Sequence, residues 1–392
     1  SDLATTGISA TKIWTTLAWH VADHRGAPER LSELGNQVRP VLAVAYGPGG
    51  RTVATADSEC TVTSWDLTDP ARPVRRGTIP TQQGNGISSA AFSPDGRTLA
   101  CVDRDYYEPK VTLSDVTDPA HPVALATIAE IRGLYGVAFS PDGRTLAIGA
   151  NGVFHPRGGV DAGKLMLWSL AARAHPVLLA TQPGFAGPLV FSPDGRTVAS
   201  SDGSGATVVW DVTDRSHPVQ LAGLNGHSTA VTTLGFSPDG RTIATGSADR
   251  IVILWDLTDR IRPRRLATLT GDGKVRSISF AADLRTLAIG TDDQAVTLWD
   301  IAARSTPVRL ATLKGNGVQT GSVVFSPDRH TLALRGNPDL PNQKVTLWDY
   351  RELNELRADP VGYACATVGE GLHEHDWDLY VPEVPYQLTC RR

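Results

Sequence analysis

Residues 158–164 are the part of the chain that most closely approaches a nucleotide-binding motif. They satisfy the pattern G-x-x-x-x-G-K, in which backbone amides and a lysine can surround the phosphates of a nucleotide. Leu165 follows, however, where a phosphate-binding loop needs Ser or Thr for magnesium, and the segment opens a strand rather than a helix. We therefore expect no nucleotide site here, and no other segment indicates a cofactor.

Histidines and acidic residues offer a second possible chemistry, metal binding. Residues 373–376 read His-Glu-His-Asp, but they coincide with a polar turn, and acidic residues are favoured at a solvated helix start. Three His-Pro pairs, at His121, His175 and His217, occupy equivalent turns of successive repeats and cannot converge on one ion. The G-x-S-x-G, H-E-x-x-H and paired-cysteine zinc signatures do not occur in the sequence. We expect no metal, no catalytic residues and no enzymatic activity.

The composition of the 392 residues argues against two classes of partner. The formal net charge is −4 and Lys and Arg form no block, so nothing indicates a surface for nucleic acid. Apolar residues come in short runs, none of them approaching the roughly 18 residues that a membrane span needs. We expect a cytoplasmic protein, and, because the chain begins without Met in the middle of a pattern, a piece of a longer one.

Four cysteines are too few for a disulfide scaffold. Cys60 and Cys101 fall within the repeated part of the chain, and we expect them to be small buried side chains, as free cysteines usually are. Cys365 and Cys390 bracket the C-terminal tail, and the sequence leaves open whether they are bridged.

One short pattern occurs seven times between about residue 40 and residue 350. Each copy contains an aromatic residue, a turn of the Ser-Pro-Asp-Gly type, Arg-Thr, an apolar run and usually Trp-Asp, and the copies are 44 to 52 residues apart. The anchoring aromatics are Tyr46, Phe92, Phe139, Phe191, Phe236, Phe280 and Phe325. Repeats of this length cannot bury their apolar faces alone, so they must stack or close into a ring.

The fifth copy shows what one unit contains. Residues 231–236 alternate apolar and polar, residues 237–240 form the turn, and residues 242–246 and 251–255 are extended. Pro, Asp and Gly suit successive positions of that turn. After the Trp-Asp position, a Pro precedes one more apolar segment, such as residues 310–313 in the sixth copy, where it costs no ladder bond. Each unit is therefore predicted to contain four strands.

Seven units of four strands predict an all-β fold, a seven-bladed β-propeller of four-stranded antiparallel blades. Radial closure also leaves only short exposed strand edges. A large ring at one fixed place in the third strand can fill the gap between blades. That place is occupied by six of the nine tryptophans, Trp65, Trp168, Trp210, Trp255, Trp299 and Trp348. The second unit has Ser114 there, and we expect its packing to be weaker.

These residues resemble the WD40 repeat family. Five units carry the Trp-Asp pair, and the fifth also has the family's Gly-His, at Gly226 and His227. The resemblance implies that His227, Ser247, Asp249 and Trp255 form the family's buried tetrad, in which a carboxylate orients an imidazole, the imidazole meets a hydroxyl and an indole N–H closes the chain. Most other units lack the histidine, so we expect packing to dominate stability and His227→Ala to loosen one blade.

The C-terminal tail resembles a segment that follows WD40 domains in bacteria, especially actinobacteria. The resemblance is carried by Cys365, Trp377, Tyr380, Pro385, Tyr386 and Cys390. It implies a short helical capping tail over residues 351–392. Proteins with this ending resemble signalling NTPases of the STAND type, which implies that the chain is the C-terminal propeller of a larger bacterial signalling protein.

The other boundaries follow from where the pattern starts and stops. The seventh unit lacks its outer strand and residues 28–35 match that strand, so we predict a propeller over residues 28–350 that is closed by an N-terminal outer strand. Residues 1–27 contain further strand-like segments. They are extra strands or a remnant of a preceding blade, or else belong to an eighth blade or a second propeller.

Function in a repeat ring is expected where copies break the pattern, because insertions form loops on one face. Three copies enlarge the connection between the second and third strands, and the WD40 resemblance places these loops, with those joining successive blades, on the face commonly used for partners. Exposed aromatics beside Arg are typical of interaction hot spots. The predicted partner-binding residues are Tyr106, Tyr107, Tyr135, Phe154, His155, Arg157, Phe185, Asp339 and Leu340.

Taken together, the sequence predicts a non-catalytic platform for protein interaction and sensing. The partner is a protein, or another domain of the parent chain that the ring holds inactive, and it binds on the loop face. The alternative is a propeller enzyme or a small-ligand receptor that uses the central channel. A cluster of ionisable residues with perturbed environments at the channel mouth would favour that alternative.

Overall fold

The structure is a computed structural model of the chain. It describes residues 28–34, 39, 41–47, 49–79, 87–103, 109–118, 123–129, 131, 133–151, 163–183, 187–201, 205–293, 295–314, 320–336, 345–351 and 353. By its contacts the chain divides into two compact units, one of Leu31–Leu347 and one of Ser1–Arg30 with Trp348–Arg392. Apart from Trp348 and Asp349 at the end of the seventh, the repeats belong to the unit Leu31–Leu347.

The strands follow the repeat. The first blade contains β2 (Val41–Tyr46), β3 (Thr52–Asp57), β4 (Val62–Asp66) and β5 (Val74–Ile79). The second contains β6 (Ile87–Phe92), β7 (Thr98–Asp103), β8 (Val111–Asp115) and β9 (Val123–Ile128). The third contains β10 (Leu134–Phe139), β11 (Thr145–Ala150), β12 (Lys164–Ser169) and β13 (Val177–Pro183). The fourth contains β14 (Leu189–Phe191), β15 (Thr197–Ser201), β16 (Ala206–Asp211) and β17 (Val219–Asn225).

The remaining three blades continue this order. The fifth contains β18 (Val231–Phe236), β19 (Thr242–Ser247), β20 (Ile251–Asp256) and β21 (Arg264–Thr270). The sixth contains β22 (Val275–Phe280), β23 (Thr286–Thr291), β24 (Ala295–Asp300) and β25 (Val308–Lys314). The seventh contains β26 (Thr320–Phe325), β27 (Thr331–Gly336) and β28 (Val345–Asp349), together with β1 (Glu29–Leu34) from the beginning of the chain.

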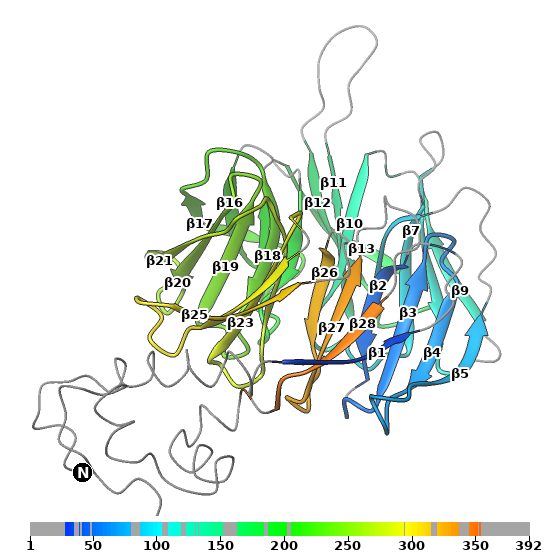
Figure 1. The fold of residues 1–392 in the computed structure, drawn as a ribbon. Helices are drawn as coiled ribbons and strands as arrows, with labels where there is room; N and C mark the ends of the chain where they lie inside the picture. Colours follow the sequence, from blue (N-terminus) through cyan, green and yellow to red (C-terminus); the bar gives the residue numbers. More distant parts are fainter. Residues whose placement is uncertain are drawn as a thin grey trace, which may run out of the picture. The chain divides into compact units, whose positions relative to one another are not determined.

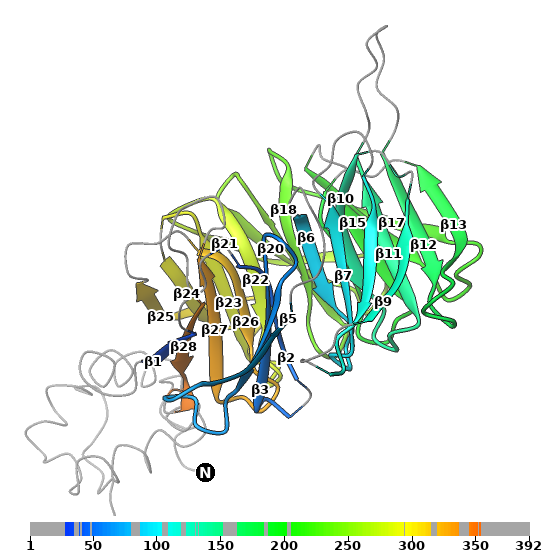
Figure 2. The ribbon, with the colours of Figure 1, turned by 90° about the vertical axis from the view of Figure 1, so that its right-hand side faces the viewer.

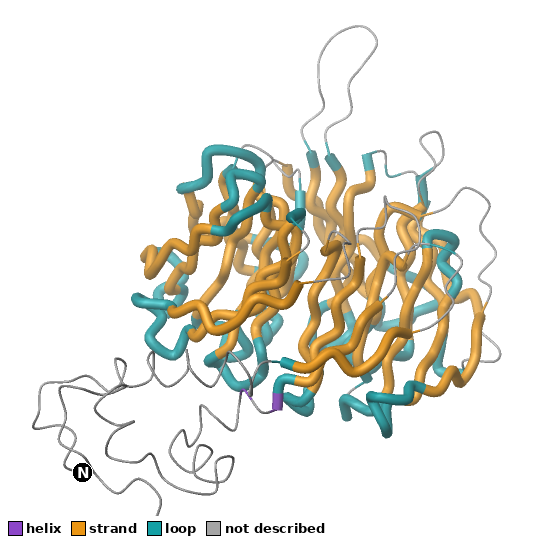
Figure 3. Tube along the Cα trace, in the orientation of Figure 1, coloured by secondary structure: helices purple, strands orange, loops and turns teal. Residues whose placement is uncertain are grey.

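Each sheet has four strands, and in six of the seven sheets their spatial order is their order in the chain. Neighbouring strands within these six sheets run antiparallel, as in the fifth blade. The first strands of neighbouring blades contact one another, so they lie innermost around a common axis, as Figures 1 and 2 show. This confirms the predicted all-β, seven-bladed propeller. Figure 3 shows that strands account for nearly all of the regular structure.

The Ser-Pro-Asp-Gly turn joins the first two strands through a local hydrogen-bond network. In the fifth blade Ser237 Oγ donates to Asp239 Oδ1 at 2.5 Å and accepts from the Thr242 amide at 3.0 Å. The Gly240 amide donates to the Ser237 carbonyl at 2.8 Å, and Gly240 has a φ of +67°, which a residue without Cβ adopts at little cost. The turn chemistry read from the sequence therefore accounts for this hairpin.

The apolar core lies between the blades rather than inside any one of them. Every residue of β7, β11, β19 and β23 is buried, because neighbouring blades cover both faces of these second strands. Trp255 of the fifth blade packs in one cluster with Ala199 and Val209 of the fourth. The repeated tryptophan thus fills the space between two blades, as its position in the sequence predicts.

The seventh sheet has the order β1-β28-β27-β26, so its outer strand comes from the opposite end of the chain. Leu34, Val345 and Leu347 pack in one cluster with Val53 and Trp65 of the first blade. This pairing lets two segments about 310 residues apart in sequence complete one blade, which closes the ring without a free edge at that place.

The predicted helical tail is not supported. Residues 354–392 lie outside the described part of the chain, including Cys365 and Cys390, and helical backbone appears only at positions 351 and 353. Residues 1–27 also lie outside it. The predicted domain boundaries after residues 27 and 350 therefore stay predictions.

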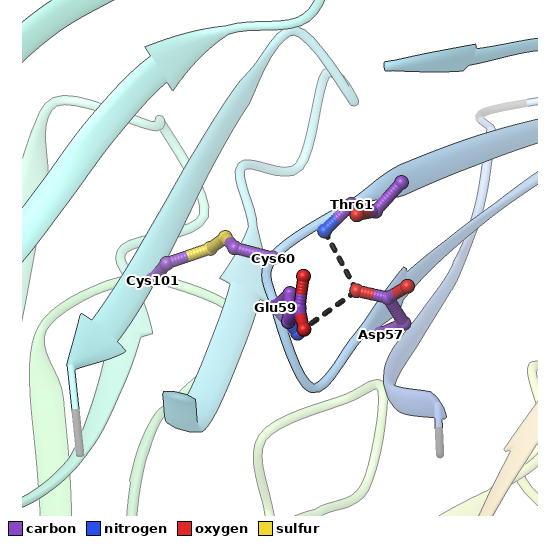
Figure 4. Close-up of a disulfide and its surroundings, with 5 residues drawn as sticks. All are labelled: Asp57, Glu59, Cys60, Thr61 and Cys101. Atoms are coloured by element: carbon purple, nitrogen blue, oxygen red, sulfur yellow. Dashed lines mark hydrogen bonds between the residues drawn. A yellow bond between two sulfur atoms is a disulfide. The ribbon is translucent and has the colours of Figure 1, made fainter. Parts of the chain in front are cut away.

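Cys60 and Cys101 are buried, as predicted, but they are joined in a disulfide rather than free (Figure 4). Cys60 lies in the turn between β3 and β4 of the first blade, whereas Cys101 lies in β7 of the second. Their Cα atoms are 6.4 Å apart although 41 positions separate them in the sequence. Only the face-to-face packing of two blades brings them together, so no local pattern indicates the bond.

Candidate interaction surface

Most of the predicted partner-binding residues fall outside the described part of the chain. These are Tyr106, Tyr107, Phe154, His155, Arg157, Phe185, Asp339 and Leu340. Their roles stay predictions. Tyr135 is the member of the set that the structure describes.

Tyr135 is the second residue of β10, where the chain enters the third blade. It is 42% exposed and is the one aromatic among the large apolar residues that are exposed in the described ranges. Burial of the rest of the side chain raises the pKa of the phenol, and the nearby Arg276 guanidinium lowers it in part. The phenol is therefore neutral at neutral pH, with an exposed ring edge and a hydroxyl that can form hydrogen bonds.

Arg276 is the second residue of β22 in the sixth blade, the position equivalent to Tyr135. Because the first strands surround the axis and run in the same sense, the two residues lie at the same end of the ring that these strands form, and Arg276 is near enough to influence the Tyr135 phenol. The Arg276 side chain is 48% exposed, and its Nη2 lies 3.9 Å from Asp292 Oδ2. Asp292 Oδ1 is held by the Lys274 amide at 2.8 Å. We call Tyr135 and Arg276 the channel-mouth pair.

The fifth blade contains a hydrogen-bonded chain of the kind that the WD40 resemblance implies. Asp249 Oδ2 lies 3.1 Å from His227 Nδ1 and accepts from the Ser228 amide at 3.0 Å. His227 Nε2 lies 2.8 Å from Thr245 Oγ1, and Trp255 Nε1 donates to the same oxygen at 3.1 Å. Burial raises the pKa of Asp249, but the Ser228 amide and the charge of His227 outweigh burial and lower it. Every polar side-chain group in this hydrogen-bond network is paired, so the arrangement serves folding.

The structure replaces one predicted member of this tetrad, because Thr245 and not Ser247 supplies the hydroxyl. Ser247 Oγ instead donates to the Ala230 carbonyl at 2.8 Å. The pairing of β19 with β20 explains the difference, since it sets Trp255 opposite Ile243. Thr245 is then the diagonal neighbour of the indole, whereas Ser247 is four residues along the strand, about 13 Å away.

The same diagonal relation recurs outside the fifth blade. Trp210 Nε1 donates to Ser200 Oγ at 3.1 Å, and Ser200 is the fourth residue of its strand, as Thr245 is. Where that fourth residue is aliphatic, Trp299 donates to Thr297 on its own strand at 2.9 Å, and the buried Trp168 indole has no acceptor among the described residues. A hydroxyl at the fourth place of the second strand therefore accompanies this contact in the fourth and fifth blades, but it does not ensure it. In the first blade Thr55 stands at that place and donates to the Thr63 carbonyl, while the buried Trp65 indole nitrogen has no acceptor among the described residues.

The described residues give no support to metal or membrane chemistry. They contain no group of three or more His, Cys, Asp or Glu side chains that could hold an ion. No helix among them has the length and apolar character needed to cross a bilayer. His217, one of the three histidines at equivalent His-Pro turns, pairs with Asp214 at 3.0 Å on the surface, which agrees with its expected role as a turn residue.

Comparison with known proteins agrees with this architecture. The family model "WD domain, G-beta repeat" matches residues 75–106, 218–256 and 263–300. Among solved structures, the β-propeller domain of Cps50 (Swd1) from Myceliophteria thermophila superposes with a TM-score of 0.66 and 17% sequence identity, covering 82% of this chain and 99% of that one. The search of curated proteins found no match. The chain therefore contains WD40 repeats and has a β-propeller fold, a class that generally serves as a non-catalytic scaffold for protein interaction.

Proposed function

We propose that this chain is a non-catalytic platform for protein interaction and sensing, and that it forms the C-terminal propeller of a larger cytoplasmic bacterial signalling protein resembling the STAND type. Its partner is a protein, or a domain of the same parent chain, bound on the loop face. We expect neither nucleic acid nor a membrane to bind there, because the charge of −4 supplies no basic surface.

The channel-mouth pair is the observation that supports this proposal. Tyr135 presents an exposed aromatic ring and Arg276 a half-exposed guanidinium at the same end of the channel. Tyr and Arg are enriched among residues that dominate binding energy, since each combines a large contact area with hydrogen-bond donors. The Asp292 carboxylate is far enough from Arg276, at 3.9 Å, for a partner's acidic or carbonyl group to compete for the guanidinium.

The alternative function, an enzyme or small-ligand receptor in the channel, gains nothing from Tyr135. A general base must lose its proton near the working pH. Burial raises the pKa of the Tyr135 phenol, which moves it further from that range. The residue is better suited to contact than to proton transfer.

Photo-crosslinking tests the proposed surface directly. A photoreactive p-benzoylphenylalanine replaces Tyr135, and the chain is irradiated in a lysate of its own organism. We expect one dominant protein adduct, and we expect Arg276→Ala to diminish it, because the two side chains share the same channel mouth. The matched control places the same group at Val219, which is 59% exposed at the start of the outer strand β17 and lies away from the channel.

A second variant tests the predicted loops. Replacing Tyr106, Tyr107 and Phe154 by Ala together should abolish the adduct without lowering the melting temperature. Equal adducts from positions 135 and 219, or an adduct that survives the triple replacement, would contradict a partner site on the loop face.

A further inference from the structure

Ion pairs of one kind join neighbouring blades on the side of the ring where the Ser-Pro-Asp-Gly turns lie. In each, an arginine that follows the third strand of one blade reaches the turn aspartate of the preceding blade. The three pairs are Arg215 with Asp142, Arg260 with Asp194 and Arg304 with Asp239, at 3.7, 2.6 and 2.7 Å. Between the second and third blades, Arg173 Nη1 donates to Thr98 Oγ1 at 3.0 Å beside the equivalent turn. We call these four contacts the interblade clamps.

The interface between the first and second blades lacks the residues for such a clamp. The turn of the first blade reads Gly-Pro-Gly-Gly, so Gly49 stands where the other turns have aspartate. Pro119 stands at the arginine position of the second blade, and Ser114 at its tryptophan position. The cluster in this interface is built largely from small side chains, with Ala43, Ala56, Cys60, Val62, Leu99 and Cys101 among its members. Two devices that hold other blades together are thus missing here.

The disulfide occupies this same interface (Figure 4). Cys101 is the fourth residue of β7, the position at which Thr245 and Ser200 receive an indole hydrogen bond in their own blades. A covalent bond to the first blade therefore stands where a tryptophan contact stands elsewhere. Both cysteines are almost completely buried, at 2% and 3% exposure.

The turn that carries Cys60 is held in shape by its own hydrogen bonds. Asp57 Oδ1 accepts from the Glu59 amide at 2.9 Å and from the Thr61 amide at 2.8 Å, as Figure 4 shows. The Cys60 amide donates to the Asp57 carbonyl at 2.9 Å, with Cys60 at a φ of +62°. The left-handed conformation is uncommon for a residue with a side chain. It directs the sulfur toward the second blade.

We propose that the Cys60–Cys101 bond is a redox-controlled lock on the interface between the first and second blades. In the reaction a cellular dithiol attacks the disulfide, the Cys60–Cys101 bond breaks to give two thiols, and the dithiol leaves as its own disulfide, so two electrons and two protons are transferred. The interface that loses this cross-link then opens before the clamped interfaces do. Disulfides in the reducing cytoplasm are usually redox-sensing or catalytic, so the choice of a switch over a permanent link rests on the proposed cytoplasmic location.

Burial of both sulfurs sets how the lock is released. A thiolate must reach a sulfur in order to attack it, so reduction requires the two blades to separate briefly. We therefore expect dithiothreitol to reduce the bond slowly in buffer and at least tenfold faster in a urea concentration well below the unfolding transition.

Hydrogen exchange followed by mass spectrometry of the full chain tests the proposal. On reduction with dithiothreitol, we expect peptides from β3 and β7 to exchange at least tenfold faster, while peptides from β19 and β23 keep their rates. The double variant Cys60→Ala/Cys101→Ala should reproduce this pattern without reductant. If that variant does not fold, the reduced wild-type chain still provides the measurement.

A matched control opens a clamped interface instead. Arg260→Gln in the oxidised chain should accelerate hydrogen exchange in β15 and β19, which lie on either side of the interface between the fourth and fifth blades. The exchange rates of β3 and β7 should stay unchanged. Faster hydrogen exchange in all blades on reduction, or an unchanged exchange rate in every blade, would overturn the proposal of a lock. So would two free thiols in chain that had been fully exposed to air.

Discussion

Replacing Thr245 by Val tests whether the structure identifies the right hydroxyl in the fifth blade. Val has nearly the same shape as Thr, so the change removes the oxygen and leaves little cavity. It deprives two groups of their partner, His227 Nε2 at 2.8 Å and Trp255 Nε1 at 3.1 Å. A buried polar group left unpaired costs about 1–3 kcal/mol, so the two together should lower the free energy of unfolding of this blade by about 2–6 kcal/mol.

Ser247→Ala is the matched comparison for this prediction. Ser247 Oγ donates to the Ala230 carbonyl, pairs with the Thr229 hydroxyl and accepts from the Asp249 amide at 3.3 Å. The His227 ring and the Trp255 indole bond to Thr245 instead, so loss of the Ser247 hydroxyl should cost about 1 kcal/mol. Native-state hydrogen exchange of β19 reports the local free energy of opening, which is suitable for a repeat protein that need not unfold in one step. A larger loss for Ser247→Ala than for Thr245→Val would refute the role assigned to Thr245.

Two further predictions concern pH and the unpaired indoles. Burial raises the pKa of Asp194, but the Ser192 hydroxyl and the Arg260 guanidinium outweigh it and hold the pKa at about 2 in the folded chain, against 3.8 for the ordinary group. Its contribution to stability is therefore complete above about pH 5 and is lost as the pH falls toward 2, and Arg260→Gln should make acid titrations of melting temperature shallower over this interval. Trp168→Phe should destabilise the chain by about 1 kcal/mol less than Trp255→Phe, measured by urea denaturation, because only the Trp255 indole N–H loses a partner in the described structure. Equal losses for the two tryptophans would contradict this account.

Local chemistry is what the sequence reveals on its own. The alternation of apolar residues, the Ser-Pro-Asp-Gly turn and the fixed place of tryptophan each depend on residues within one repeat, so they predict strands, hairpins and the number of blades. The same reasoning places Tyr135 on a connection between blades, whereas the structure places it one residue into β10. It does not extend to Arg276, because the relation between these two residues runs across the channel from the third blade to the sixth.

Register was the first property that only the tertiary structure decided. Thr245 and Ser247 lie on the same face of β19, and both are hydroxyl residues, so composition cannot choose between them. The pairing of Ile243 with Trp255 decides between them, because it places Thr245 beside the indole. Ser247 lies two residues further along the strand, about 7 Å away, and is therefore beyond hydrogen-bond reach.

The contacts between blades were the second property that only the tertiary structure decided. From its own repeat, Cys60 looks like any small buried residue, and Arg260 and Asp194 look like solvated turn residues. Closure of the ring sets each blade against the next and brings these distant positions within bonding distance, at 6.4 Å between the cysteine Cα atoms and 2.6 Å between Arg260 and Asp194. The repeat by itself therefore determined what each blade is, and the geometry of the closed ring decided how the blades are held together, since packing across an interface depends on both of its sides.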